Sequence, residues 1–124
     1  MDKETLEIRL IDFGSVSAYH LGFYRIFRGT LICAPPEYWT EKVYAADSFT
    51  AWSVGLILYN MVCGKFPFKS KLHIMFPKFF PSIFENVDIS ESCKNLICLC
   101  LATVPDKRIT MDEISSHPWL VTAD

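Results

Sequence analysis

The most regular feature of the chain is an apolar stretch between residues 51 and 63. Large apolar side chains surround a helix built from this stretch on all sides: Trp52, Val54, Leu56, Ile57, Leu58, Tyr59, Met61 and Val62. A helix that is apolar all round belongs in the middle of a larger protein body. Thr50 is placed to cap its start and Gly64 to end it. The pattern therefore predicts a buried central helix over residues 51–63.

The front of the chain has a different period. Residues 7–10 alternate, with Leu6, Ile8 and Leu10 on one side, which predicts a β-strand. Asp12 to Ser15 interrupts the alternation, and residues 15–34 show no sustained period. Loops of that length in a compact domain are usually functional.

Three shorter helices are predicted further along. Pro35-Pro36-Glu37 suits a helix start, with proline at the first position and an acid near the positive end. Residues 65–89 are rich in loops, with a short helix near 70–76. Ser90 can cap a helix through Ala102, and the apolar face of this helix follows helical spacing: Cys93, Leu96, Ile97, Cys100 and Leu101.

The last predicted helix has the clearest start signal. Thr110 and Glu113 have the spacing of a capping box, and Ile109 and Ile114 that of a hydrophobic staple. The helix should end before His117-Pro118, because proline disfavours helix at the preceding residue. The chain is thus predicted to be one mainly α unit, residues 1–124, with a strand at its front.

Composition narrows the class of protein. Of the 124 residues, 51% are hydrophobic and 15% aromatic, so disorder is not expected. The net charge of −2 gives no reason to expect nucleic acid or a membrane as partner. Residues 54–63 are shorter than the roughly 20 residues of a membrane span, and the polar start Met1-Asp2-Lys3-Glu4 precedes no signal-peptide core. A soluble protein of the cytoplasm or nucleus is expected.

The five cysteines do not suggest a disulfide scaffold, because their number is odd. Cys93, Cys98 and Cys100 lie close together, but their spacing matches no familiar zinc pattern. We expect the cysteines to serve as small core side chains, with a metal site as the alternative.

Asp12-Phe13-Gly14 is the first motif with possible chemistry. A carboxylate at a strand end can hold Mg²⁺, and glycine lets the backbone turn sharply. By itself the tripeptide is equally explained as an ordinary turn that ends a strand. Pro35-Pro36-Glu37 alone is likewise explained as a helix start.

Order and spacing favour a functional interpretation. A DFG motif followed, after a long loop, by a triplet like Ala-Pro-Glu is typical of the protein-kinase activation segment. Over residues 8–120 the chain resembles this family at further motifs in family order: Gly29-Thr30-Leu31-Ile32-Cys33-Ala34-Pro35-Pro36-Glu37, Trp52-Ser53-Val54-Gly55, Gly64-Lys65-Phe66-Pro67-Phe68, Pro105-Asp106-Lys107-Arg108 and His117-Pro118-Trp119. The chain resembles a partial C-terminal lobe of a serine/threonine kinase, closest to the Pim-like kinases. The resemblance implies an α+β parent fold of which this chain holds the DFG strand, the activation segment and helices EF to I.

The resemblance also assigns roles near the reaction centre. Asp12 would chelate the Mg²⁺ that bridges ATP phosphates. Phe13 would pack against the regulatory spine, and Gly14 would let the segment flip. Gly29, Thr30 and Cys33 would form the loop that receives the substrate residue after the phosphoacceptor. The Gly-Thr form implies serine or threonine substrates.

Other implied roles are structural. Glu37 would pair with Arg108 and lock the activation segment to the lobe. Without the resemblance, Arg108 is interpreted as a solvated surface arginine, because arginine is rarely buried. Thr50, Trp52 and Gly55 would be the F-helix anchor.

Departures from the family pattern put efficient catalysis in doubt. Cys33 replaces a tyrosine, and Thr50 replaces the aspartate that braces the catalytic loop, an aspartate that Pim-like kinases also lack. No serine or threonine occupies the usual activating site just before Gly29, so activation by phosphorylation is not expected, although Tyr24 stays open.

The glycine-rich loop, its lysine and glutamate pair, and the HRD catalytic loop are not found in the sequence. We therefore expect the chain alone to be inactive and poorly stable, in a family of enzymes that use ATP and Mg²⁺ on protein substrates. The alternatives are a non-catalytic kinase-like module that docks on a kinase or regulatory partner through the exposed F helix, or a helical domain with accidental motifs.

Overall fold

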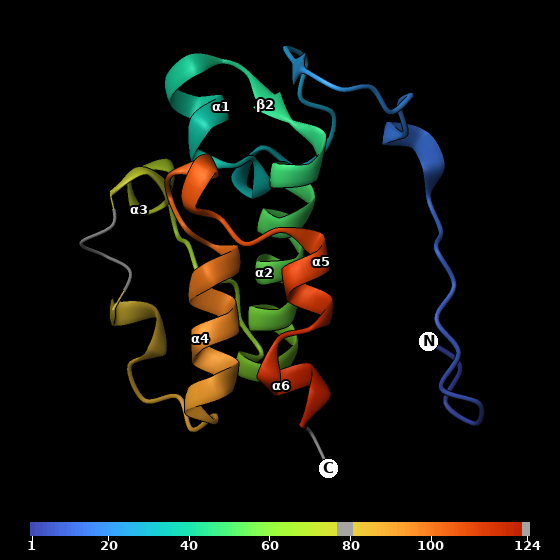
Figure 1. Cartoon of the computed structure of the whole chain (residues 1–124), viewed down its shortest axis with the longest axis vertical. Helices are drawn as coiled ribbons and strands as arrows, with labels where there is room; N and C mark the ends of the chain where they lie inside the picture. Colours follow the sequence, from blue (N-terminus) through green and yellow to red (C-terminus); the bar gives the residue numbers. More distant parts are fainter. Residues whose placement is uncertain (77–80, 123–124) are drawn as a thin grey trace.

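The computed structural model describes residues 1–76 and 81–122 and shows a helical body with an extended N-terminal segment beside it (Figure 1). The α-helices and strands, in chain order, are β1 (Phe23–Tyr24), α1 (Pro36–Glu41), β2 (Tyr44–Ala45), α2 (Ala46–Cys63), α3 (Lys71–Met75), α4 (Glu91–Cys100), α5 (Met111–Ser115) and α6 (Pro118–Val121). Short 3-10 turns lie at Phe13–Ser15, Leu31–Cys33, Pro81–Phe84 and Pro105–Lys107. No helix within these described residues is long and apolar enough to cross a membrane.

Helix α2 forms the centre of the body, as predicted. It runs through the middle of the molecule and packs mainly on α4, with α5 beside it (Figure 1). Trp52 is fully buried and Tyr59 is 1% exposed. Gly64 ends the helix with a left-handed backbone (φ 68°), a conformation that glycine adopts without steric cost. Burial is not complete around the helix, because Ile57 and Met61 are 59% and 76% exposed.

The start of α2 lies earlier than expected, so the prediction that Thr50 caps the helix is wrong. The helix begins at Ala46, directly after β2, and Ala45 is its N-cap without a side-chain hydrogen bond. The Thr50 hydroxyl instead donates to the carbonyl of Ala46, 2.8 Å away and one turn back. The antiparallel pairing of β1 with β2 (Tyr24 opposite Tyr44) sets where the helix begins, and this pairing carries no local sequence signal.

The strand predicted at residues 7–10 is also wrong. No secondary structure is formed there, and Leu6, Ile8 and Leu10 are 68%, 79% and 82% exposed. A strand needs a neighbour for its backbone hydrogen bonds, and an isolated alternating segment has none. The strands observed are instead the two short ones at 23–24 and 44–45.

The helix signals predicted at residues 35–37, 70–76 and 90 are confirmed. Pro36 occupies the first turn of α1, α3 lies within the expected short helix, and the Ser90 hydroxyl caps α4 by accepting from the Cys93 amide. Helix α4 ends at Cys100, slightly before the expected Ala102. Residues 77–80 of the predicted loop-rich stretch lie outside the described residues.

The capping box that starts α5 is formed as predicted. The Thr110 hydroxyl accepts from the Glu113 amide, and the Glu113 carboxylate accepts from the Thr110 amide, which lowers the pKa of that carboxyl. The helix ends at Ser115, before His117-Pro118, and His117 then caps α6 by accepting from the Trp119 amide.

The core lies between α2 and α4. The predicted apolar face of α4 is buried throughout, at 2% exposure or less: Cys93, Leu96, Ile97, Cys100 and Leu101. Burial raises the pKa of the Cys100 thiol to about 12, so it acts as a core side chain. The two helices approach closely at Gly55, where an added Cβ would lie 2.7 Å from Cys100 Cβ. Glycine at this position therefore sets the spacing of the two helices.

Candidate functional site

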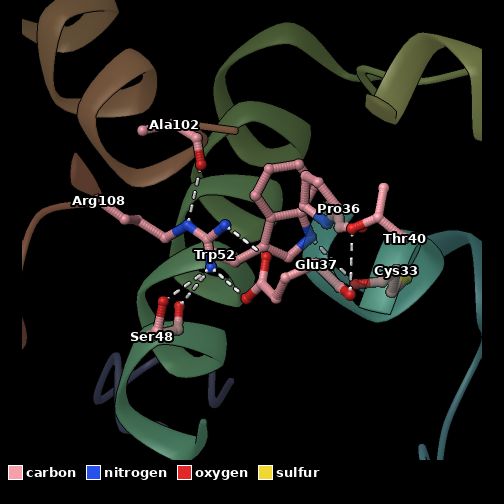
Figure 2. A network of polar contacts seen from close by, with 8 residues as sticks. All are labelled: Cys33, Pro36, Glu37, Thr40, Ser48, Trp52, Ala102 and Arg108. Carbon is pink, nitrogen blue, oxygen red and sulfur yellow. Dashed lines mark hydrogen bonds and ion pairs between the residues drawn. The ribbon is translucent and has the colours of Figure 1, made fainter. Parts of the chain in front are cut away.

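A buried arginine network joins the front of the helical body to its C-terminal part (Figure 2). Arg108 donates to both carboxylate oxygens of Glu37, from Nη1 at 2.9 Å and from Nη2 at 2.8 Å. The two residues are 71 positions apart in sequence. The Arg108 side chain is fully buried and that of Glu37 is 6% exposed. The ion pair expected between these residues is therefore present, and the surface alternative for Arg108 is excluded.

Arg108 makes further hydrogen bonds through Nε and Nη1. Nε donates to the carbonyl of Ala102 at 3.0 Å, and Nη1 donates to the carbonyl and hydroxyl oxygens of Ser48 at 3.1 and 3.0 Å. The guanidinium lies over the ring of Trp52, 5.2 Å from its centroid. A buried charge is tolerated when it is paired and hydrogen-bonded, and here each nitrogen of the guanidinium has at least one acceptor. The network links α1, α2 and the turn before α5 at one point.

The loop that precedes α1 is fastened to the central helix. Trp52 Nε1 donates to the carbonyl of Cys33 at 3.1 Å (Figure 2). Cys33 is partly buried, which raises the pKa of its thiol. Gly29 and Thr30 are exposed, and Gly29 has a positive φ of 143° that other residues rarely adopt. The sequence-predicted substrate loop is thus an exposed turn with a fixed end at Cys33.

The residues of the predicted F-helix anchor have unequal environments. Trp52 and Gly55 are buried on the side of α2 that faces the body, whereas Thr50 is exposed on its first turns. Thr50 contacts none of the other predicted site residues through a hydrogen bond among the described residues; its hydroxyl is used within the helix. Trp52 and Gly55 position the helix, and Thr50 is left facing solvent.

Asp12 has an unusual backbone and an exposed side chain. Its φ and ψ of 61° and 76° lie in the left-handed region, and its Oδ1 accepts from the Gly14 amide at 3.4 Å. Aspartate tolerates this conformation better than most residues, and such outliers cluster at functional sites. Phe13 is 64% exposed and lies outside the hydrophobic core of the described residues.

The donor set around Asp12 fits only part of a metal site. No group of three or more His, Cys, Asp or Glu side chains that could hold a metal occurs among the described residues. Mg²⁺ in nucleotide sites takes one or two carboxylates and completes its shell with phosphate oxygens and water. Asp12 can supply one such carboxylate. The chemistry of the chain is therefore compatible with a metal held jointly with a nucleotide, and Asp12 is the residue that would hold it.

Sequence reasoning missed several contacts of this region. The backbone carbonyls of Ser48 and Ala102 accept from Arg108, and such contacts carry no residue-specific signal; the Ser48 hydroxyl accepts from Arg108 as well. The Tyr19 hydroxyl donates to the Asp47 carboxylate at 3.2 Å and so connects the N-terminal segment to the start of α2. The nearby carboxylate raises the pKa of Tyr19. An aromatic cluster of Phe27, Tyr38, Tyr44 and Phe49 also joins the segment after β1 to α1, β2 and α2.

The central apolar helix, the segment ending in Pro-Pro-Glu and the buried pair that fastens it define the helical part of a protein kinase. The sequence matches the protein kinase domain family over residues 1–120. The chain therefore belongs to the protein kinase family, and its relatives make it a member of the serine/threonine branch.

Its relatives include serine/threonine-protein kinase pim-2 of Danio rerio, which is 40% identical over 98% of this chain and 38% of the relative. Serine/threonine-protein kinase prk-2 of Caenorhabditis elegans is 32% identical over 97% of this chain and 27% of its own length. Protein kinase kin1 of Schizosaccharomyces pombe is 36% identical over 95% of this chain and 14% of its own length. The chain thus spans well under half the length of each of these relatives.

Proposed function

We propose that this chain carries the metal-binding and substrate-side portion of a serine/threonine protein kinase, which transfers the γ-phosphoryl group of ATP to a serine or threonine hydroxyl of a protein. The observation that carries the proposal is the Glu37–Arg108 pair. This pair fastens the segment that leads from Asp12 to α1 onto the helical body. The family match over residues 1–120 supports the same assignment.

Asp12 has the proposed role of holding Mg²⁺ on the ATP phosphates. Its carboxylate is exposed at a sharp turn, where a nucleotide bound by other residues can reach it. When bound, the Mg²⁺–ATP complex supplies the phosphoryl group and neutralises charge on its oxygens. The role of this chain is to orient that complex through one carboxylate, that of Asp12.

The exposed turn from Gly29 to Cys33 has the proposed role of receiving the substrate backbone beside the phosphoacceptor. Its fixed end, the Cys33 carbonyl bound to Trp52, supports this role because a loop that positions a substrate needs a rigid attachment. Thr30 is exposed on this turn and free of a side-chain cap bond. Glu37 and Arg108 act as positioning residues behind it.

The 124-residue chain alone is proposed to be inactive, because transfer needs a base, a lysine and a glycine-rich loop that its sequence does not contain. The test is a Mg²⁺-dependent transfer assay with radiolabelled ATP and a serine-containing protein. We expect no transfer by the chain alone. Transfer above the background of an Asp12→Asn variant of the same chain would contradict this part of the proposal.

The length of the native polypeptide indicates whether it contains a complete kinase. Mass spectrometry of the endogenous product separates the two cases. A product much longer than 124 residues, active with ATP and inactivated by Asp12→Asn, supports the kinase. An active longer product that is unaffected by Asp12→Asn contradicts the role of Asp12.

A non-catalytic binding module is the second candidate, and one observation favours it. Ile57 and Met61 project from the central helix into solvent, and apolar grooves of about 390 and 210 Å³ lie on either side of this pair. Exposed apolar patches of this kind mark interaction surfaces. A native product of 124 residues that co-purifies with a kinase would support this candidate. If an Ile57→Asp variant no longer bound that kinase, the patch at Ile57 and Met61 would be the binding surface.

A further inference from the structure

A cavity of about 300 Å³ opens on the body away from Asp12 and from the exposed turn at Gly29. It lies where the end of α2, the loop that follows it, α3 and the turn Pro81–Phe84 meet. Its lining residues are Tyr59, Lys65, Phe66, Pro67, Phe68, Lys69, His73, Ile83, Glu85 and Asn86. The volume is at the lower end of the range of about 300–1,000 Å³ for small-molecule sites.

Two aromatic side chains in the wall of the cavity, Tyr59 and Phe68, are held in place by their surroundings. Tyr59 is 1% exposed, and its hydroxyl donates to the carbonyl of Ile83. Phe68 is 4% exposed and stacks on Trp52, with ring centroids 5.5 Å apart and planes 2° from parallel. Side chains fixed by packing and hydrogen bonding give a preformed site, which lowers the entropy cost of binding.

The rim of the cavity is positively charged. Lys65 and Lys69 are both exposed and line it from the loop after α2. The sequence from residue 48 to residue 84 contains no aspartate or glutamate, although the chain as a whole has a net charge of −2. Glu85 lines the opposite side and offsets part of this charge. Two ammonium groups at the mouth of an aromatic-walled cavity favour a ligand with an apolar body and a negative group.

We propose that this cavity binds a small organic anion with an aromatic body, of the class of aromatic carboxylates. The carboxylate meets Lys65 and Lys69 at the rim, and the ring lies against the wall that contains Tyr59, Phe66 and Phe68. The site is independent of the proposed phosphoryl transfer, since none of its residues belongs to the segment from Asp12 to Glu37. The same chemistry is offered by a free aromatic acid and by the C-terminal phenylalanine of a polypeptide.

The test is a titration of the isotope-labelled 124-residue chain with 2-naphthoate, followed by two-dimensional NMR. We expect saturable shifts at residues 65–69 and 83–86, with a dissociation constant on the order of 1 mM for a ligand of this size. The neutral 2-naphthamide should bind roughly fivefold more weakly, because it cannot pair with the lysines. A second titration uses N-acetylphenylalanine, which resembles the C-terminus of a polypeptide. Tighter binding of this probe indicates a polypeptide C-terminus, and tighter binding of 2-naphthoate indicates a free aromatic acid.

Matched variants measure how much the lysines at the cavity contribute to the binding of 2-naphthoate. Lys65→Ala combined with Lys69→Ala should weaken 2-naphthoate about three- to tenfold, whereas Lys3→Ala combined with Lys107→Ala removes the same charge elsewhere and should leave binding unchanged. Glu85→Gln should tighten binding about twofold, because it removes the one carboxylate of the lining. Equal binding of 2-naphthamide, equal effects of the two lysine pairs, or shifts confined to the grooves beside Ile57 would each overturn the proposal.

Discussion

The N-terminal segment, residues 1–22, and the helical body from residue 34 onward each contain a regular apolar pattern, in the segment at residues 6–10, yet only the body buries it. In the N-terminal segment Ile8, Leu10 and Leu21 are 79–85% exposed, and the dark blue start of the segment stands apart from the helices in Figure 1. In the body Leu96, Ile97 and Leu101 are at most 1% exposed. The two regions therefore differ in packing partners and not in the quality of their patterns.

The difference shows why helices and strands depend differently on the rest of a chain. A helix satisfies its backbone hydrogen bonds within itself, so α4 needs only one apolar face to lie against α2. A strand leaves its amides and carbonyls to a neighbouring strand, and residues 7–10 pair with no strand among the described residues. The part of the chain that holds Asp12 is consequently the part with the fewest stabilising contacts, and we expect it to open first.

The largest expected effect is on the buried pair that holds the body together. Arg108→Ala leaves the Glu37 carboxylate buried without its partner and should lower the free energy of unfolding by about 3–5 kcal/mol. Urea denaturation followed by tryptophan fluorescence measures this change. The neighbouring Lys107→Ala, an exposed position, should change it by no more than about 0.5 kcal/mol.

The double variant Glu37→Leu, Arg108→Met sharpens this prediction. Replacing both partners by apolar side chains leaves no unpaired buried charge. We therefore expect the double variant to recover much of the free energy of unfolding that Arg108→Ala loses. A single Arg108→Ala variant that costs less than about 1 kcal/mol would mean that the pair does not hold α1 to the body.

An intermediate effect is expected where α2 meets α4. Gly55→Ala in the interior of a helix would ordinarily stabilise it by about 0.5–1 kcal/mol. Here the added Cβ would lie 2.7 Å from Cys100 Cβ and 2.8 Å from Leu101 Cδ2, so we expect a net loss of about 1–3 kcal/mol. Asn60→Ala on the exposed side of α2 is the control and should be neutral or slightly stabilising. A stabilising Gly55→Ala would show that the helices separate freely.

The smallest expected effect is in the N-terminal segment. Ile8→Ser combined with Leu10→Ser should change the free energy of unfolding by no more than about 0.5 kcal/mol, because both side chains are exposed. Leu96→Ala in the core should cost about 2–5 kcal/mol in the same urea experiment. If the Ile8→Ser, Leu10→Ser variant lost more than about 1 kcal/mol of its free energy of unfolding, these side chains would have to pack against the body. The two regions would then not differ in burial.

Signals that act within one or two helical turns were reliable in this chain. Ser90, Thr110 with Glu113, and Gly64 sit at helix ends where their side chains or backbone satisfy local groups. The face of α4 was predictable for the same reason, since residues three and four apart share one side of a helix. The kinase motifs were visible because each depends on a short run of residues at one place.

Features that depend on distant segments were decided by the tertiary structure. The start of α2 at Ala46 follows from the pairing of β2 with β1, and the expected strand at residues 7–10 lacks a partner. Burial of Arg108 follows from contacts with Glu37, Ser48 and Ala102, which lie up to 71 residues away. Apart from the start of α2, the sequence alone determined the helix signals, the order of the motifs and the apolar faces, because these depend on neighbours within a few residues. Which apolar faces are buried was decided only by packing, since that depends on which distant segments come together.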